Sequence, residues 1–191
     1  AVGWLPRASG SGYWLGHQGA KAVVADLEGR GRPTALTPAF LQILGVPQND
    51  EWADNGRPMA LKLFVDAVYA MRPIELARLA PAVIANRDDP VAAALIAEAT
   101  AYLASDFAAA FDPAMPGPVA LGGGVIAHLS GLPDAISEVV RAAGHVPDIR
   151  PVVDGSIGAI VLAMRAFGIT VDQAMFDTIA VSLAASAAVS A

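Results

Sequence analysis

The stretch PVALGGGVI, residues 118–126, decides the fold class that this sequence predicts. Val119, Ala120 and Leu121 form a short apolar run, and three glycines, Gly122 to Gly124, follow it directly. A strand that leads into a glycine turn is the simplest interpretation of this pattern. Since the preceding hundred or so residues follow a helical period, strands are expected only from this point onward.

The residues after this turn alternate between helix and strand patterns. Pro133 at a first helical position and Gly144 just past the end bracket one helix. The sequence then predicts, in order, a helix over 134–143, a strand over 145–153, a turn over 154–158, a helix that Gly168 ends, and a last helix started by a Thr170/Gln173 capping box. Such alternation predicts parallel strands with crossover helices, an α/β unit over 117–191.

The residues before Pro118 are predicted to form helices only. A stripe of apolar and small residues at spacings of three and four predicts a helix over 11–28, which Gly29 can end as a C-cap. Further helices are expected over 37–44 with Thr37 as N-cap, over 59–71, in one or two short pieces within 73–86, and from Asp89-Pro90 to Pro113. Together they form a helical elaboration over 11–113.

Length, composition and charge exclude several classes of protein. The 191 residues suit one domain or one lobe, and a hydrophobic fraction of 55% is incompatible with a disordered chain. The uncharged C-terminal stretch 178–191 is too short to span a bilayer, and no membrane helix is expected. A net charge of −6 with scattered basic residues disfavours nucleic-acid binding. The lack of cysteine suits a reducing cytoplasm, where we expect the protein to reside.

The two glycine turns carry the strongest chemical signal. Gly122 to Gly124 could let a nucleotide approach the backbone or could form a plain turn, and the residues leave both open. The spacing is not the dinucleotide fingerprint, and no P-loop lysine follows. For Gly155 and Gly158 the sequence favours tight packing of a helix on a strand. Both turns are nevertheless expected at the carboxyl edge of one parallel sheet, where ligands of α/β folds bind.

The remaining polar residues predict no catalytic group and no metal site. Acids at loop or helix starts, among them Asp50, Asp54 and Asp89, are expected to cap helices. Ser9 and Ser11 lack the context of a nucleophile elbow. The histidines lie far from one another in sequence and are interpreted as surface or packing residues: His17, His128 and His145.

Three segments, in order along the chain, resemble one known family. Residues 10–21, GSGYWLGHQGAK, resemble the start of the first long helix in the second lobe of N-acetylglucosamine kinases and BadF-type ATPases. Residues 118–125 resemble that family's adenosine-contact strand and glycine turn, and 154–164 resemble its final Gly/Ala-rich helix. The resemblance implies an α/β fold over 1–191: the C-terminal lobe of an actin-like ATPase, ribonuclease H-like, with short parallel strands, a large helical elaboration and no N-terminal lobe.

The resemblance also implies a reaction and a set of contacts. ATP and Mg²⁺ would lie between two lobes, and phosphate would pass to a hydroxyl of an amino sugar, N-acetylglucosamine or glucosamine. By carry-over, Gly122, Gly123 and Gly124 would contact the adenosine or α-phosphate side of ATP, and Gly155 and Gly158 would border the purine pocket. Gly10 and Ser11 would lie on the sugar side.

The sequence departs from the family directly before Gly10. The family has Gly-Asp-Glu there, and its carboxylates help to hold the sugar, whereas this chain has Arg7, Ala8 and Ser9. Loss of two hydrogen-bond acceptors weakens discrimination between sugars. The phosphate loops and the catalytic aspartate of the family have no equivalent here, so we expect a lobe that is inactive alone and that could need a missing N-terminal lobe as partner.

Two other interpretations follow from the same residues. A degenerate lobe could serve as a non-catalytic interaction module or as the interface of a homodimer. An activator ATPase of acyl-CoA dehydratases shares the family, but those proteins hold an iron–sulfur cluster through cysteines and this chain has none.

Overall fold

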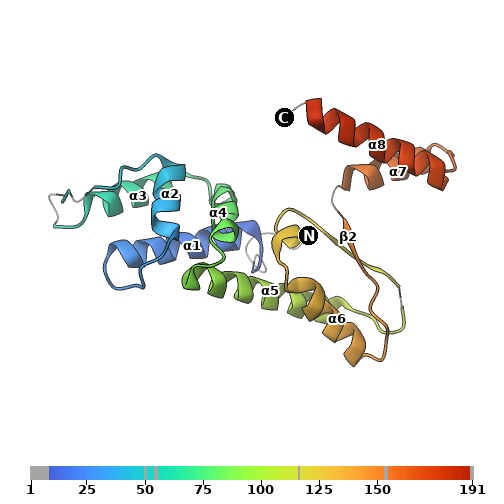
Figure 1. Ribbon diagram of the computed structural model, residues 1–191, viewed down its shortest axis with the longest axis horizontal. Helices are drawn as coiled ribbons and strands as arrows, with labels where there is room; N and C mark the ends of the chain where they lie inside the picture. The colour runs from blue at the N-terminus through green and yellow to red at the C-terminus, as the bar shows by residue number, and fades with distance from the viewer. Residues whose placement is uncertain (1–8, 50, 54–55, 116, 153–154, 190–191) are drawn as a thin grey trace.

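The computed structural model describes residues 9–49, 51–53, 56–115, 117–152 and 155–189 (Figure 1). The helices and strands, with η marking 3₁₀-helices, are α1 (Gly12–Leu27), α2 (Leu36–Leu44), α3 (Met59–Ala70), η1 (Pro73–Leu79), α4 (Ala80–Ala85), α5 (Pro90–Ala110), β1 (Val119–Gly122), η2 (Ile126–His128), α6 (Leu132–Ala142), β2 (Ile149–Val152), α7 (Gly155–Ala166) and α8 (Gln173–Val189). The order of helices and strands is the one that the sequence predicts.

The two strands form a parallel pair, as predicted. Val119 lies opposite Ile149 and Gly122 lies opposite Val152, and the crossover between the strands contains α6. The first ladder hydrogen bond runs from the Val119 amide to the carbonyl of Asp148. The second strand begins four residues later than predicted, after Pro147, which has no N–H to donate to a ladder.

The helices from α1 to α5, here called the helical unit, enclose the main apolar core. α1 is the central helix: it packs on η1, α2, α3, α4 and α5, and the side chains of Leu15 and Val23 are fully buried. The largest side chains around them that are also fully buried are Phe40, Phe64, Leu36, Leu41, Leu79 and Val83. Burial of each such side chain contributes about 1.5–3 kcal/mol of hydrophobic stabilisation, so the stability of the molecule is concentrated here.

Two glycines of α1 allow its neighbours to approach closely. A Cβ added to Gly16 would lie 1.9 Å from the carbonyl oxygen of Leu76, and a Cβ added to Gly19 would lie 2.8 Å from the Phe40 ring. No larger residue fits between α1 and η1 at Gly16. The sequence places Gly16 on the apolar stripe but does not reveal this backbone contact.

One predicted N-cap is present in the structure and another is not. Asp89 caps α5 through bonds of 3.0 Å from the Val91 and Ala92 amides, as expected. Thr37 was the wrong residue for the start of α2, because the helix begins at Leu36 and the Thr37 hydroxyl donates to Asp26 instead. The acids Asp50 and Asp54 lie outside the described residues.

Asp89 also joins two helix starts. Its carboxylate accepts from the Thr34 hydroxyl at 2.8 Å and from the Ala35 amide at 3.1 Å, just before α2. Partial burial acts to raise its pKa, but the hydrogen bonds from Ala92, Ala35, Thr34 and Val91 outweigh burial, and the pKa of Asp89 lies below its ordinary value.

The predicted capping box at the last helix is wrong. α8 begins at Gln173, so the N-cap position falls on Asp172, whose carboxylate accepts from the Met175 amide at 2.9 Å. The Gln173 side chain donates to Asp177 and does not reach back to Thr170. A carboxylate one residue before the helix reaches the N3 amide directly, which leaves the threonine without a capping role.

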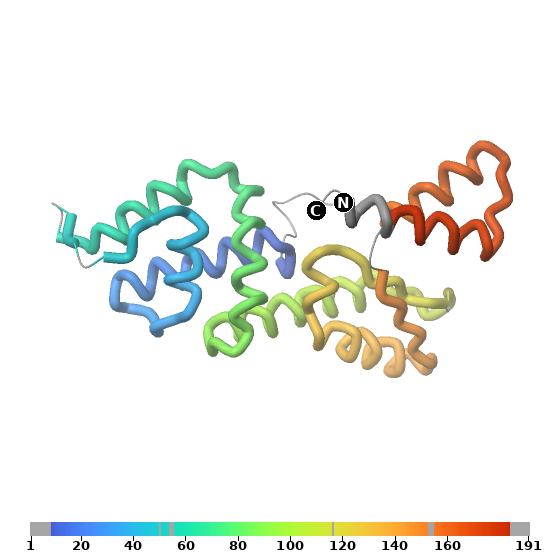
Figure 2. Tube along the Cα trace, turned by 45° about the horizontal axis from the view of Figure 1, so that its top comes forward, coloured from blue at the N-terminus to red at the C-terminus, as the bar shows by residue number. Residues whose placement is uncertain are grey.

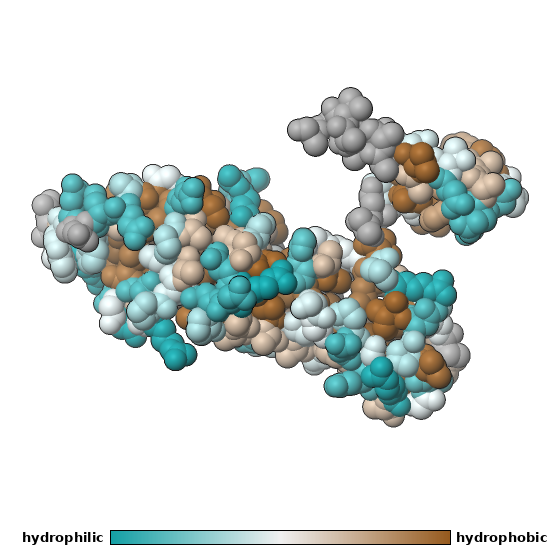
Figure 3. Space-filling model, in the orientation of Figure 1, coloured by the Kyte–Doolittle hydropathy of each residue, from teal (hydrophilic) through white to brown (hydrophobic). Residues whose placement is uncertain are grey.

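The C-terminal hairpin, α7 and α8, stands apart from the helical unit in both ribbon and tube views (Figures 1 and 2). Its two helices pack on each other, and none of the residues of α7 is buried. Leu162 and Phe167 are 68% and 86% exposed, and apolar side chains lie at the hairpin surface in Figure 3. The hairpin therefore contributes little to the core.

One helix of the described residues is long and apolar enough to cross a membrane by length and composition, which the sequence analysis did not expect. It is α5, with a mean hydropathy of 1.3 over its most apolar window. Glu98 and Asp106 interrupt the apolar sequence, and Ala92 and Ala99 are buried against neighbouring helices. A single helix of this kind is weak evidence for a membrane span.

Candidate functional site

The carboxyl ends of β1 and β2 bring Gly122 to Gly124 and the start of α7 to one edge of the sheet. The predicted turn over 154–158 is wrong, because α7 begins at Gly155 and Gly158 lies within this helix. Because Gly122 and Val152 are partners in the parallel register, the chain leaves both strands at the same level. A Cβ added to Gly122 would lie 3.2 Å from Cβ of Val152, so this register position favours glycine. Gly123 has a φ of +125°, a conformation that L residues with side chains rarely adopt.

The other glycines at this edge face open space. Within the described residues, and apart from the adjoining residues of the chain itself, no atom lies within 4 Å of a Cβ added to Gly124, Gly155 or Gly158, and all three residues are exposed. The packing interpretation of Gly155 and Gly158 is therefore wrong, because no strand or helix lies close enough to require a missing side chain. We call Gly122 to Gly124, Gly155 and Gly158 the glycine corner.

The glycine corner offers backbone donors to a ligand. Gly155 begins α7, and the first amides of a helix have no partner within the helix and carry partial positive charge. Residues 153 and 154 between β2 and α7 lie outside the described residues. The arrangement suits an anionic or polar ligand that contacts backbone N–H groups at the sheet edge.

The predicted sugar-side residues lie at the start of α1. The Ser11 hydroxyl caps this helix by accepting from the Trp14 amide at 3.2 Å. Gly10 has a φ of +77°, and a Cβ added to it would lie 2.8 Å from Cγ of Leu103 on α5. Both residues thus have structural roles, and their predicted contacts with a substrate stay predictions. Arg7 and Ala8 lie outside the described residues.

A packing contact links the start of α1 to the glycine corner. A Cβ added to Gly12 would lie 3.4 Å from Cγ2 of Val125, the residue that follows Gly124. The segments 10–12 and 122–125, more than a hundred residues apart in sequence, are therefore neighbours. The structure brings together one turn of the corner and the predicted sugar side.

The histidines have packing or surface positions, as predicted. The His17 ring stacks on Tyr13 with centroids 5.7 Å apart, and His145 Nε2 lies 3.0 Å from the carbonyl oxygen of Pro113. His128 is exposed. Within the described residues no group of three histidine, cysteine, aspartate or glutamate side chains could hold a metal ion.

The nearest charged pair on the sheet lies at the opposite end from the corner. Arg150 donates two hydrogen bonds to Asp148, of 3.1 and 2.7 Å, just before and within β2. The hydrogen bond from Arg150 lowers the pKa of the Asp148 carboxyl, although slight desolvation acts in the other direction. This pair is exposed and leaves the glycine corner without a carboxylate from β2.

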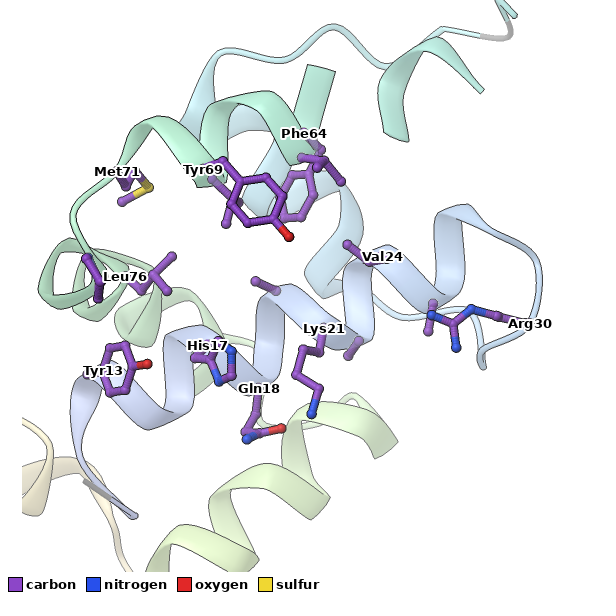
Figure 4. Close-up of a pocket in the computed structure, with 16 residues that line it drawn as sticks. Tyr13, His17, Gln18, Lys21, Val24, Arg30, Phe64, Tyr69, Met71 and Leu76 are labelled. Atoms are coloured by element: carbon purple, nitrogen blue, oxygen red, sulfur yellow. The ribbon is translucent and has the colours of Figure 1, made fainter. Parts of the chain in front are cut away.

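The structure also contains a groove that runs along α1 beneath α3, which the sequence analysis did not identify. We call it the α1–α3 groove; its cavity volume is about 910 Å³. Its lining includes Tyr13 and His17 of α1, Phe64 and Val68 of α3, and Leu76 of η1 (Figure 4). Spacings of four and seven place Tyr13, His17 and Val24 on one face of α1. The sequence analysis interpreted the apolar stripe of this helix only as a packing face and His17 as a surface or packing residue.

Comparison with solved structures gives a match in both sequence and fold. No protein-family model matches the chain, and no curated protein matches it. The solved structure is a candidate N-acetylglucosamine kinase from Chromobacterium violaceum, 30% identical, with a TM-score of 0.56 over 78% of this chain. The match covers 46% of that protein, so the chain spans less than half of its length. The similarity supports the predicted sugar-kinase-like relationship.

Proposed function

We propose that this chain is the nucleotide-binding C-terminal lobe of an ATP-dependent amino-sugar kinase, of actin-like ATPase type and BadF family. The observation that carries the proposal is the glycine corner: the turn after β1 and the start of α7 after β2 lie at one edge of the parallel strands, and open space surrounds Gly124, Gly155 and Gly158. Ligands of α/β folds bind at this edge. The likeness to a candidate N-acetylglucosamine kinase supports the same reading.

In this proposal the corner holds the nucleotide through its backbone. Gly122, Gly123 and Gly124 contact the adenosine or α-phosphate side of ATP, and Gly155 and Gly158 border the purine. The residues fit this role, since side chains at three of these positions would fill space that is now open. Because the described residues offer no carboxylate cluster, Mg²⁺ would arrive on the phosphates of the nucleotide.

The amino sugar would bind at the start of α1, near Gly10 and Ser11, and N-acetylglucosamine and glucosamine are the proposed sugars. The contact between Gly12 and Val125 supports a shared site, because it joins this segment to the nucleotide turn. Phosphoryl transfer depends on positioning and on neutralisation of charge from both sides of the phosphates. We therefore propose a lobe that needs a partner lobe for activity in the cytoplasm.

A second candidate function is a non-catalytic interaction or dimerisation module. The observation that favours it is the exposed apolar surface of the C-terminal hairpin, where Leu162 and Phe167 contact little of the described structure. Exposed apolar patches of this kind mark protein interaction sites. In this case the glycine corner would bind no nucleotide, and the chain would form a homodimer or a complex.

Calorimetric titration with ATP·Mg²⁺ separates the two candidates. The kinase proposal predicts binding by the chain, and a loss of at least about tenfold in affinity for Gly124→Val, which fills the open corner. Gly117→Val is the matched control, because Gly117 is also open but lies at the other end of β1. Absence of ATP binding, with a dimer seen by light scattering, would support the interaction module.

Titration with glucosamine and N-acetylglucosamine tests the sugar side. We expect weak or absent binding by the chain, since Ala8 and Ser9 stand where the family has acids. The double substitution Ala8→Asp, Ser9→Glu restores two acceptors and is expected to raise sugar affinity about tenfold or more. No gain in sugar affinity would contradict the proposed sugar subsite.

A further inference from the structure

The α1–α3 groove has a largely apolar lining. Val24, Val65 and Val68 line it and are partly exposed, while Phe64 and Leu76 also line it but are buried, with exposed fractions of 0% and 7%. Tyr69 projects over the groove from α3 and is 85% exposed, while Met71 lies beside it where η1 begins (Figure 4). A large aromatic ring in this position forms a wall with no partner in the described structure.

Aromatic and adaptable side chains line the rest of the groove. The Tyr13 and His17 rings stack with an angle of 9° between their planes and line the groove from α1. The thioether of Met71 is flexible and polarisable, and such side chains adapt to ligands of different shape. A volume of about 910 Å³ is within the range of small-molecule sites in proteins.

The charge of the groove differs from that of the whole chain. The chain carries 18 acidic and 12 basic residues, yet the groove is lined by His17, Lys21 and Arg30 and by no aspartate or glutamate. Arg30 pairs with Glu28, which is outside the lining. Among the described residues Lys21 has no ion-pair partner, and its ammonium points away from Tyr69 in Figure 4 on a stem long enough to turn.

We propose that the α1–α3 groove binds an amphipathic organic anion, a carboxylate with a medium-length apolar chain. The apolar chain lies on Val24, Val65 and Val68 beside the ring of Tyr69. The carboxylate lies at the rim beside His17, where Lys21 turns to meet it. This site is separate from the glycine corner and does not depend on the proposed kinase function.

Methyl NMR with ¹³C-labelled methionine locates the binding of such an anion. Of the five methionines in the chain, Met71 alone lines the groove, and Met59, Met115, Met164 and Met175 serve as internal controls. Dodecanoate, added below its micelle-forming concentration, is expected to shift the Met71 signal and to leave Met164 and Met175 of the hairpin unchanged. Shifts confined to the hairpin methionines, or no shift at all, would overturn the proposal.

The requirement for negative charge is tested with a ligand of opposite sign. Dodecyltrimethylammonium has the same apolar chain and a cationic head, and we expect it to bind at least tenfold more weakly than dodecanoate. Equal affinity of the two ligands would mean that the groove selects only for apolar surface, and the proposed anion site would be wrong.

Two matched pairs of variants test the named residues. Lys21→Gln is expected to weaken dodecanoate binding about fivefold, whereas Lys62→Gln removes the other lysine of the chain, which lies outside the groove, and should not. Tyr69→Asp places a carboxylate on an exposed wall and should weaken binding more than tenfold. Its control, Ile74→Asp, changes a residue that is 61% exposed and outside the lining. Unchanged affinity in both Lys21→Gln and Tyr69→Asp would contradict the proposal.

Discussion

Gly16 in α1 and Gly158 at the sheet edge are the same residue type in opposite surroundings. At Gly16 an added Cβ would meet the carbonyl oxygen of Leu76 at 1.9 Å, whereas at Gly158 it would meet no described atom within 4 Å beyond its own stretch of helix. The first kind of glycine allows two backbones to pack, and the second leaves a surface open. The comparison teaches that a glycine indicates a ligand site only when packing does not already explain it.

The largest loss of stability is expected at Gly16, where α1 contacts the backbone of η1. Gly16→Ala would force α1 away from η1, because the Leu76 carbonyl belongs to the main chain and cannot rotate aside. We expect a loss of about 3 kcal/mol in the free energy of unfolding, at the upper end of overpacking effects, measured by urea denaturation. A variant as stable as the wild type would show that the two helices do not pack at this distance.

A smaller loss of stability is expected at Gly19, one turn further along α1. At Gly19 the added Cβ would meet ring atoms of Phe40 at 2.8 Å and a methyl of Val83 at 3.2 Å, and side chains can shift. Gly19→Ala should therefore cost about 1–2 kcal/mol. Combination with Phe40→Leu, which removes the ring, should reduce the added cost of the alanine. Additive losses in the double variant would argue against this contact.

Loss of a helix cap should cost more stability in the helical unit than in the C-terminal hairpin. Asp89→Ala removes the cap of α5 and the bonds to Thr34 and Ala35, so a loss of about 1–2 kcal/mol is expected. Asp172→Ala removes only an exposed cap of α8 and should cost about 0.5 kcal/mol. Thermal unfolding of both variants checks the order, and a larger loss for Asp172→Ala would contradict it.

Asp89 also predicts a pH dependence. Its folded-state pKa is lowered, so its contribution is fully present above the pKa of the unfolded chain, about 3.9. The contribution is lost as the pH falls from there through the lower folded-state value. Denaturation of wild type and Asp89→Ala should therefore give stabilities that converge below about pH 4. A difference in stability between the two proteins that grows on acidification would contradict the lowered pKa of Asp89.

The smallest effect on stability, of opposite sign, is expected at the glycine corner. Gly158 lies inside α7 with open space around it, so Gly158→Ala should stabilise the helix by about 0.4–1 kcal/mol. The same methyl group would border the proposed purine site and should weaken ATP·Mg²⁺ binding. Loss of stability in this variant would show that Gly158 has a packing role after all.

The sequence predicts local structure well and tertiary contact poorly. Gly29, Gly45 and Gly168 all have the positive φ of helix ends, since a breaker after an apolar stripe is a local signal. The parallel register of β1 and β2 also follows from the order of elements. The approach of Leu76 to Gly16 does not, because it depends on two segments sixty residues apart.

At the candidate site, too, the sequence predicts local structure better than tertiary contact. The sequence locates both strand ends of the glycine corner, but it predicts a turn where Gly155 begins α7. It also assigns the wrong environment to Gly155 and Gly158, because openness is a property of what lies nearby in space. The link between Gly12 and Val125 and the α1–α3 groove are likewise products of packing between distant segments.

The most direct test follows glycine amides during a titration with ATP·Mg²⁺. In a chain labelled with ¹⁵N-glycine, the account predicts shifts for the signals of Gly122, Gly123, Gly124, Gly155 and Gly158, with Gly16 and Gly19 unchanged. Shifts in only one of the two turns, or in neither at saturating nucleotide, would contradict a nucleotide site at this sheet edge.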